Sequence, residues 1–174
     1  MIERPFRLPL ADGEVVSGEV RIRQGAPPRS AVVLVHGFKG FRRWGFFPWL
    51  ARRLAARGYA AVTFDFSLNG VARDADRITE LERFARNTFS REVDELRRVV
   101  DGVLEGELVP RRPDRVGLLG YSRGGGISLL AARSDERIRA LVTWASVSTF
   151  DRWSEETRRE WRREGRVHVL DRRT

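Results

Sequence analysis

Short apolar stretches along this chain alternate with stretches in which apolar residues recur every three or four positions. The first pattern is typical of strands and occupies residues 6–10, 15–23, 31–35, 60–64, 116–119 and 138–145. The second is typical of helices and occupies residues 48–57 and 90–104. Two further helices are predicted on other grounds: residues 127–132 offer an apolar side for packing, and residues 154–164 alternate acids and arginines, with pairs such as Glu155 and Arg159 four positions apart. Strands that alternate with helices predict βαβ units, and therefore an α/β fold: a mostly parallel sheet with helices on both faces.

The segments between these elements show weaker patterns. Asp12-Gly13 is a hairpin turn signal between the first two strands. Residues 71–86 are charged and irregular and fit neither pattern. Residues 166–170 alternate apolar and polar positions and predict a final short strand. A chain of 174 residues is one domain by length.

The sharpest local pattern is Gly120-Tyr121-Ser122-Arg123-Gly124, which joins a predicted strand to a predicted helix. A strand, a sharp turn and a helix with a serine at the tip form the layout of a nucleophile elbow. Gly120 and Gly124 suit that turn, since side chains there would collide with each other or with a neighbouring strand. An ordinary glycine-rich turn with an incidental serine also fits this motif alone.

Composition excludes several kinds of site. The chain has no cysteine, which excludes disulfides and thiolate metal sites, and its two histidines disfavour a His-rich metal site. We therefore expect neither a metal nor a cofactor. The N-terminus lacks the apolar core of a signal peptide, and no apolar run approaches the ~20 residues of a membrane span. These features predict a cytoplasmic protein without a membrane partner.

The net charge of +9 raises the question of nucleic-acid binding. Lys39 is the only lysine, so 32 of the 33 basic residues are arginines, and they are interleaved with Glu and Asp along the whole chain. Charge spread in this way is typical of a solvated, ion-paired surface. We expect no nucleic-acid partner, and polyanion binding stays a third hypothesis for function.

A second motif stands nearer the N-terminus. His36-Gly37-Phe38 directly follows the apolar strand at residues 31–35. With the elbow at residues 120–124, it makes the whole chain resemble the α/β-hydrolase family, particularly its dienelactone-hydrolase-like and prolyl-oligopeptidase-like serine hydrolases. The two motifs stand in the family's order, each after the expected kind of element.

The resemblance implies a role for each motif residue. Ser122 would be the nucleophile, and the backbone N–H groups of Phe38 and Arg123 would form the oxyanion hole. Four further residues would shape the site without reacting: His36, Gly37, Gly120 and Gly124. Asp65, at a strand end, would make loop hydrogen bonds.

The family's catalytic acid and base are harder to place, because they follow the serine in the order acid, then histidine. The favoured interpretation is that the chain is C-terminally truncated: the acid and the histidine lie beyond Thr174, and residues 146–174 begin a cap insertion in an incomplete domain. The strand at residues 138–145 would then have an unpaired edge. The alternative is a compact triad of Ser122, Asp151 and His168.

The leading functional hypothesis is therefore a serine hydrolase that cleaves a carboxylic ester, or a short peptide or amide, through an acyl-enzyme on Ser122. Its partner would be a small-molecule substrate; the oligomeric state stays open. The second hypothesis is a non-catalytic binding or scaffold protein built on the hydrolase fold, which the missing base motivates.

Overall fold

The computed structural model describes residues 1–25, 27–72, 77–151 and 153–168. Within these ranges the strands are β1 (Ile2–Pro9), β2 (Val15–Ile22), β3 (Ser30–Val35), β4 (Ala60–Asp65), β5 (Arg115–Tyr121) and β6 (Ile138–Trp144). The helices are α1 (Phe47–Ala56), α2 (Leu81–Ala85), α3 (Phe89–Leu104), α4 (Arg123–Arg133) and α5 (Glu155–Glu164).

The strands form one sheet in the order β1-β2-β4-β3-β5-β6. β3, β4, β5 and β6 run parallel, whereas the N-terminal hairpin of β1 and β2 joins β4 in antiparallel register. Val33 on β3 pairs with Val62 on β4 and Leu118 on β5, so three apolar strands meet in the middle of the sheet. The carboxyl ends of the parallel strands consequently share one edge, where ligand sites of open α/β sheets form.

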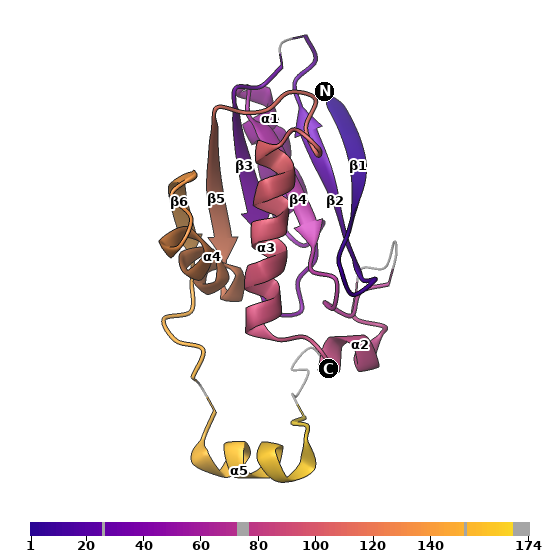
Figure 1. Cartoon of the computed structure of the whole chain (residues 1–174), viewed down its shortest axis with the longest axis vertical. Helices are drawn as coiled ribbons and strands as arrows, with labels where there is room; N and C mark the ends of the chain where they lie inside the picture. Colours follow the sequence, from indigo (N-terminus) through magenta and orange to yellow (C-terminus); the bar gives the residue numbers. More distant parts are fainter. Residues whose placement is uncertain (26, 73–76, 152, 169–174) are drawn as a thin grey trace.

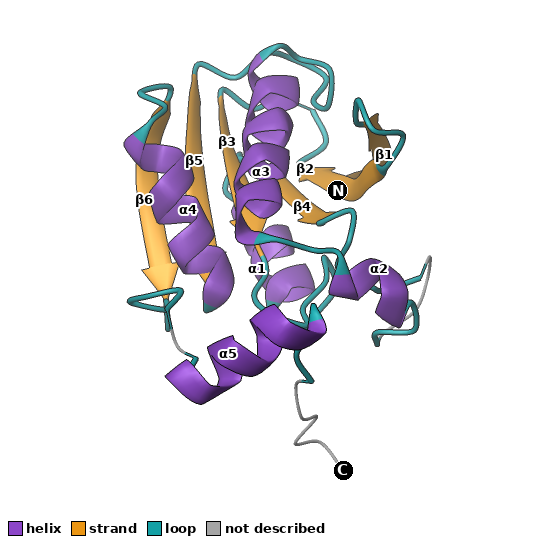
Figure 2. Cartoon of the chain, turned by 60° about the horizontal axis from the view of Figure 1, so that its bottom comes forward, coloured by secondary structure: helices purple, strands orange, loops and turns teal. Residues whose placement is uncertain are grey.

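Helices cover the two faces of the sheet. α1 packs Phe47 and Ala51 on Leu34 of β3 and Ala61 of β4. On the opposite face, α3 and α4 bury their apolar sides in a larger core, and Figure 2 shows these two helices side by side in front of the strands. The structure confirms the predicted α/β fold, with its mostly parallel sheet and helices on both faces.

The ends of the helices follow from local chemistry. α1 has Pro48 in its first turn, where a backbone N–H has no intrahelical acceptor, so proline costs no hydrogen bond there. The helix ends just before Gly58, which has a φ of 90°. α3 begins after Thr88, whose hydroxyl accepts a hydrogen bond from the N–H of Arg91. α5 begins after Ser154 in the same way and ends at Gly165 in the left-handed conformation.

Two predicted segments need correction. The irregular segment at 71–86 contains, in its described part, a bridge between Val71 and Ile78 and the short helix α2. The strand predicted at 166–170 is wrong for residues 166–168, which have no regular structure, while 169 and 170 lie outside the described residues. A short alternation has too little chain to form a strand without a partner strand beside it.

The C-terminal part of the chain packs less than the rest. β6 is the last strand of the described sheet, so its outer edge is unpaired there, as predicted. α5 buries none of its residues. Figure 1 shows α5 apart from the sheet, below the ends toward which β3, β4 and β5 run. No helix in the described part of the chain is long and apolar enough to cross a bilayer.

Candidate active site

Ser122 occupies the single position between β5 and α4. Its backbone angles are φ 53° and ψ −120°, a conformation that residues other than glycine rarely adopt. Such strain costs about 1–3 kcal/mol and persists only where the surroundings hold it. Here the Ser122 N–H donates to the carbonyl of Trp144 at 3.0 Å, and the Ser122 carbonyl accepts from Gly125 and Val147 at 3.0 and 3.2 Å. The end of β6 therefore holds the turn in place.

Glycines allow the turn to lie directly against the end of β3. A Cβ at Gly124 would collide with the carbonyl oxygens of Val35 and His36, and a Cβ at Gly120 would lie 2.6 Å from the Oγ of Ser128. At Gly37 a Cβ would lie 3.0 Å from the Cβ of Ser122. The structure thus brings the His36-Gly37 loop and the serine turn into contact.

The loop after β3 makes a tight turn of its own. The Gly40 N–H donates to the Gly37 carbonyl at 3.0 Å, and Lys39, the third residue of this turn, has a φ of 57°. This geometry is that of a type II turn. The N–H of Phe38 donates no hydrogen bond within the described residues. This donor belongs to the residue that follows Gly37, whose own position lies against Ser122.

His36 is buried, and both of its ring nitrogens are engaged. Nδ1 lies 2.9 Å from the Gly37 carbonyl, and Nε2 accepts from the N–H of Phe66 at 3.3 Å. Together these contacts indicate a neutral ring with its proton on Nδ1. Burial lowers the pKa of His36, which also favours the neutral form. The ring ties its own loop to the segment after β4.

That segment holds the loop at two more points. Asp65, at the end of β4, accepts from the N–H of Arg42 at 2.5 Å and also pairs with the guanidinium of Arg42. The side-chain amide of Asn69 donates to the Gly40 carbonyl at 3.4 Å. Asp65 therefore makes loop hydrogen bonds, as the sequence led us to expect.

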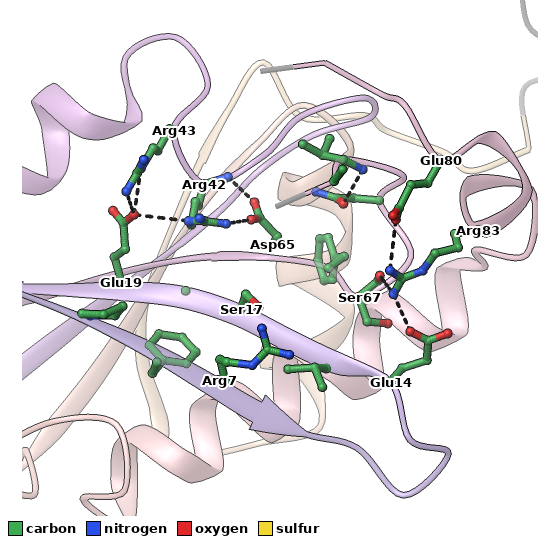
Figure 3. Close-up of a pocket in the computed structure, with 18 of the residues that line it drawn as sticks. Arg7, Glu14, Ser17, Glu19, Arg42, Arg43, Asp65, Ser67, Glu80 and Arg83 are labelled. Carbon is green, nitrogen blue, oxygen red and sulfur yellow. Dashed lines mark hydrogen bonds and ion pairs between the residues drawn. The ribbon is translucent and has the colours of Figure 1, made fainter. Parts of the chain in front are cut away.

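A cavity of about 690 Å³ lies between the N-terminal hairpin and the segment after β4 (Figure 3). Its carboxylates are already paired: Glu19 contacts both Arg42 and Arg43, and Asp65 contacts Arg42. Burial alone would raise the pKa of Glu19, but the arginines beside it hold the pKa below its ordinary value. None of the residues that line the cavity belongs to the serine turn or to residues 36–40. It is therefore a space next to the site and not the site itself.

Sequence reasoning missed Glu92. This residue lies in the first turn of α3, is 1% exposed, and accepts at Oε1 from Arg123 at 2.5 Å and from Asn87 at 2.7 Å. Burial raises the pKa of Glu92, and the charge of Arg123 opposes this rise. The spacing of Glu92 could have indicated its burial, because it is four residues before Leu96 and therefore lies on the apolar face of α3.

Asp151 and His168 are not brought together. Asp151 is exposed and pairs with Arg158 of α5, while His168 is exposed beyond the end of that helix. Among the described residues no hydrogen bond or ion pair joins either of them to the other or to Ser122. Likewise, no group of three or more potential metal ligands occurs in the part of the chain that the structure describes.

A parallel sheet, a strained serine between strand and helix, and a His-Gly loop against it define the α/β-hydrolase class. The sequence profile of the alpha/beta hydrolase family matches residues 32–173. The chain belongs to this family.

Individual relatives agree with this membership. The 2,6-dihydropseudooxynicotine hydrolase of Paenarthrobacter nicotinovorans is 28% identical over 166 residues, which are 93% of this chain but 41% of that protein. The chain therefore spans about two fifths of that relative's length.

Solved structures show the same fold. The α/β hydrolase GrgF from Penicillium sp. sh18 matches with a TM-score of 0.73 at 20% identity, covering 95% of this chain and 53% of that one. A dienelactone hydrolase from Anabaena variabilis matches with a TM-score of 0.64 at 21% identity, covering 83% of this chain and 63% of that one.

Proposed function

We propose that this chain carries the nucleophile and oxyanion hole of a serine hydrolase that cleaves a carboxylic ester or a short peptide or amide. The observation that supports this proposal most is the strained conformation of Ser122 at the junction of β5 and α4. Strain of this kind gathers at functional sites, where the surrounding structure over-determines it. Against Ser122 lies a loop with a buried neutral histidine and an N–H that donates to no described residue.

In this mechanism, the Ser122 oxygen attacks the carbonyl carbon of the substrate while a general base takes the hydroxyl proton. The carbonyl oxygen becomes an oxyanion that accepts hydrogen bonds from the N–H groups of Phe38 and Arg123. The leaving group departs with the proton, and water then hydrolyses the acyl-enzyme. Because Arg123 is the first residue of α4, the helix dipole also favours the anion.

Among the residues that the structure describes, no candidate for the general base is hydrogen-bonded to Ser122. His36 uses both ring nitrogens in loop hydrogen bonds, and Asp151 is paired with Arg158. We therefore place the acid and the base in sequence that follows Thr174. The relative from Paenarthrobacter is more than twice as long as its matched part, so it has room for further active-site residues outside that part. A compact triad of Ser122, Asp151 and His168 would require α5 and the segment after it to move.

Residues 146–174 fit the start of a cap in this proposal. Residues 145–151 and 153 leave the sheet at the end of β6, and α5 lies below the strand ends where Ser122 sits (Figure 1). A segment in that position would cover a bound substrate. The small-molecule class of substrate follows from the family; the substrate in the relative's name is not carried over at 28% identity.

A fluorophosphonate probe tests the proposal on the protein expressed from its whole reading frame. We expect stoichiometric labelling, complete loss of labelling in Ser122→Ala, and full labelling in Ser134→Ala, a control at the far end of α4. Absence of labelling, or labelling that survives Ser122→Ala, would remove the hydrolase proposal and leave a non-catalytic protein on the same fold. Ester hydrolysis by the 174-residue chain alone, abolished by Ser122→Ala, would instead favour the compact triad.

A further inference from the structure

A buried acid–base pair lies directly behind the serine turn. Glu92 of α3 is 1% exposed, and the side chain of Arg123, which follows Ser122, is 13% exposed. Their contact of 2.5 Å joins two charged groups that are withdrawn from water. Buried ion pairs contribute little net stability, because desolvation offsets the attraction. Net stability alone therefore gives no account of this pair.

The guanidinium of Arg123 indicates a role for this pair. Its central carbon lies 4.7 Å from the centroid of the Phe38 ring, within range of a cation–π contact. The ring of Phe38 also lies 5.5 Å from that of Phe84 on α2. The Arg123 side chain thus reaches from the start of α4 to the loop after β3. It connects the two residues whose backbone N–H groups form the proposed oxyanion hole.

We propose that Glu92 is a positioning residue, which through the guanidinium of Arg123 holds Phe38 and so fixes the spacing of the two oxyanion-binding N–H groups. This inference rests on the proposed function of Ser122. Glu92 touches neither the serine nor a substrate in this account. Its effect is transmitted through one hydrogen bond and one ring contact, both within the described residues.

The charges around Glu92 make this arrangement specific. Facing it are Arg123 from α4, the amide of Asn87 from the segment before α3, and Glu95 one turn further along α3. The amide of Asn87 donates to the same oxygen as Arg123, so it aligns the carboxylate without competing for the guanidinium. The positive charge of Arg123 is also felt in the oxyanion loop: burial lowers the pKa of His36, and Arg123 lowers it further.

Rates of fluorophosphonate labelling test the inference in the protein expressed from its whole reading frame. Arg123→Lys keeps the backbone N–H of residue 123, so this side-chain change separates positioning from the donor itself. We expect Glu92→Gln and Arg123→Lys each to slow labelling about tenfold, less than the 10²–10³ for losing a donor. The double variant should be no slower than either single one, since both break the same connection.

Glu95→Gln is the matched control. Glu95 is also a buried carboxylate on α3 whose pKa burial raises, but it bonds Ser67 and Arg91 instead of Arg123. We expect Glu95→Gln to lower the melting temperature as much as Glu92→Gln does while labelling at the wild-type rate. A rate loss that follows the melting temperature in all variants would overturn the positioning role.

A second measurement does not depend on catalysis. The ¹⁵N order parameter of the Phe38 amide in the 174-residue chain should be near 0.85 and fall toward 0.6 in Glu92→Gln and Arg123→Lys. Unchanged labelling and an unchanged order parameter in folded Glu92→Gln would overturn the inference and leave the hydrolase proposal intact. If the wild type does not label, the hydrolase proposal fails, and the order parameter alone decides whether Glu92 positions Phe38.

Discussion

The carboxyl ends of β3 and β5 differ sharply from the region formed by β6 and α5. At the first, His36, Asp65 and Glu92 are buried and each is hydrogen-bonded to a loop or a neighbouring element. At the second, Val142 and Trp144 are 54% and 56% exposed, and α5 buries no residue. The molecule therefore holds its serine and loop rigidly but leaves the neighbouring face uncovered. In our account the first region carries the nucleophile and the oxyanion loop, whereas the described part of the second contributes neither the acid nor the base.

The largest loss of stability should come from adding a methyl group to the closely packed serine turn. In Gly124→Ala the new Cβ meets the carbonyl oxygens of Val35 and His36, and we expect a loss of about 3 kcal/mol in the free energy of unfolding. Gly165→Ala at the end of α5 meets nothing within 4 Å and should cost only about 1 kcal/mol from its positive φ. Urea denaturation measures both; equal losses would contradict the comparison.

Shortening one strand side chain in the buried core and one on β6 compares the stability of the two regions again. Val62 on β4 is fully buried in the core, so Val62→Ala should cost about 2–3 kcal/mol through lost burial and a cavity. Val142→Ala on β6 removes a side chain that is mostly in solvent and should change stability by less than about 0.5 kcal/mol. A large loss at Val142 in the isolated chain would mean that β6 is covered.

The pH dependence of stability should report the buried histidine. Because the pKa of His36 is lowered, the unfolded chain binds more protons below pH 6.5 than the folded chain. The contribution of neutral His36 is therefore complete above about pH 6.5 and is lost as the pH falls through its folded pKa.

The difference in unfolding free energy between wild type and His36→Gln measures this loss. We expect it to shrink by up to about 1.4 kcal/mol per pH unit below pH 6.5. The carboxylates of Glu92 and Glu95, whose pKa values burial raises, are common to both proteins and cancel in this difference. A pH-independent difference would contradict the neutral, buried assignment of His36.

The smallest effect concerns the strain at the serine itself. Glycine adopts φ 53° and ψ −120° freely, so Ser122→Gly should raise the free energy of unfolding by about 1 kcal/mol. Ser146→Gly, in the segment after β6, is the control and should lower it, because it adds backbone entropy to the unfolded chain and removes the hydroxyl that donates to the Val147 carbonyl at 3.1 Å. A loss of stability in Ser122→Gly would show that the surroundings do not hold the turn under strain.

Much of the fold follows from local patterns in the sequence. The run of apolar residues at 60–64 predicts a strand, and the glycines on either side of Ser122 predict its sharp turn. Both depend on neighbours along the chain, so sequence spacing was enough. The family match then confirms the membership that His36-Gly37 and the serine turn had indicated.

The rest depends on contacts between distant segments. The position of Glu92 behind Arg123 arises only when α3 and α4 pack together, 31 residues apart in sequence. α2 escaped prediction because a helix of 5 residues is too short to show a periodic pattern. The separation of Asp151 from His168 likewise depends on how α5 lies, which residue order alone does not specify.

Mass spectrometry can locate the fluorophosphonate adduct and so identify the reacting serine. The account predicts one phosphonyl group per molecule, located on the peptide that contains Ser122, in the protein expressed from its whole reading frame. An adduct on any other serine, or none after prolonged exposure to the probe, would contradict the claim that the strained turn after β5 presents the nucleophile.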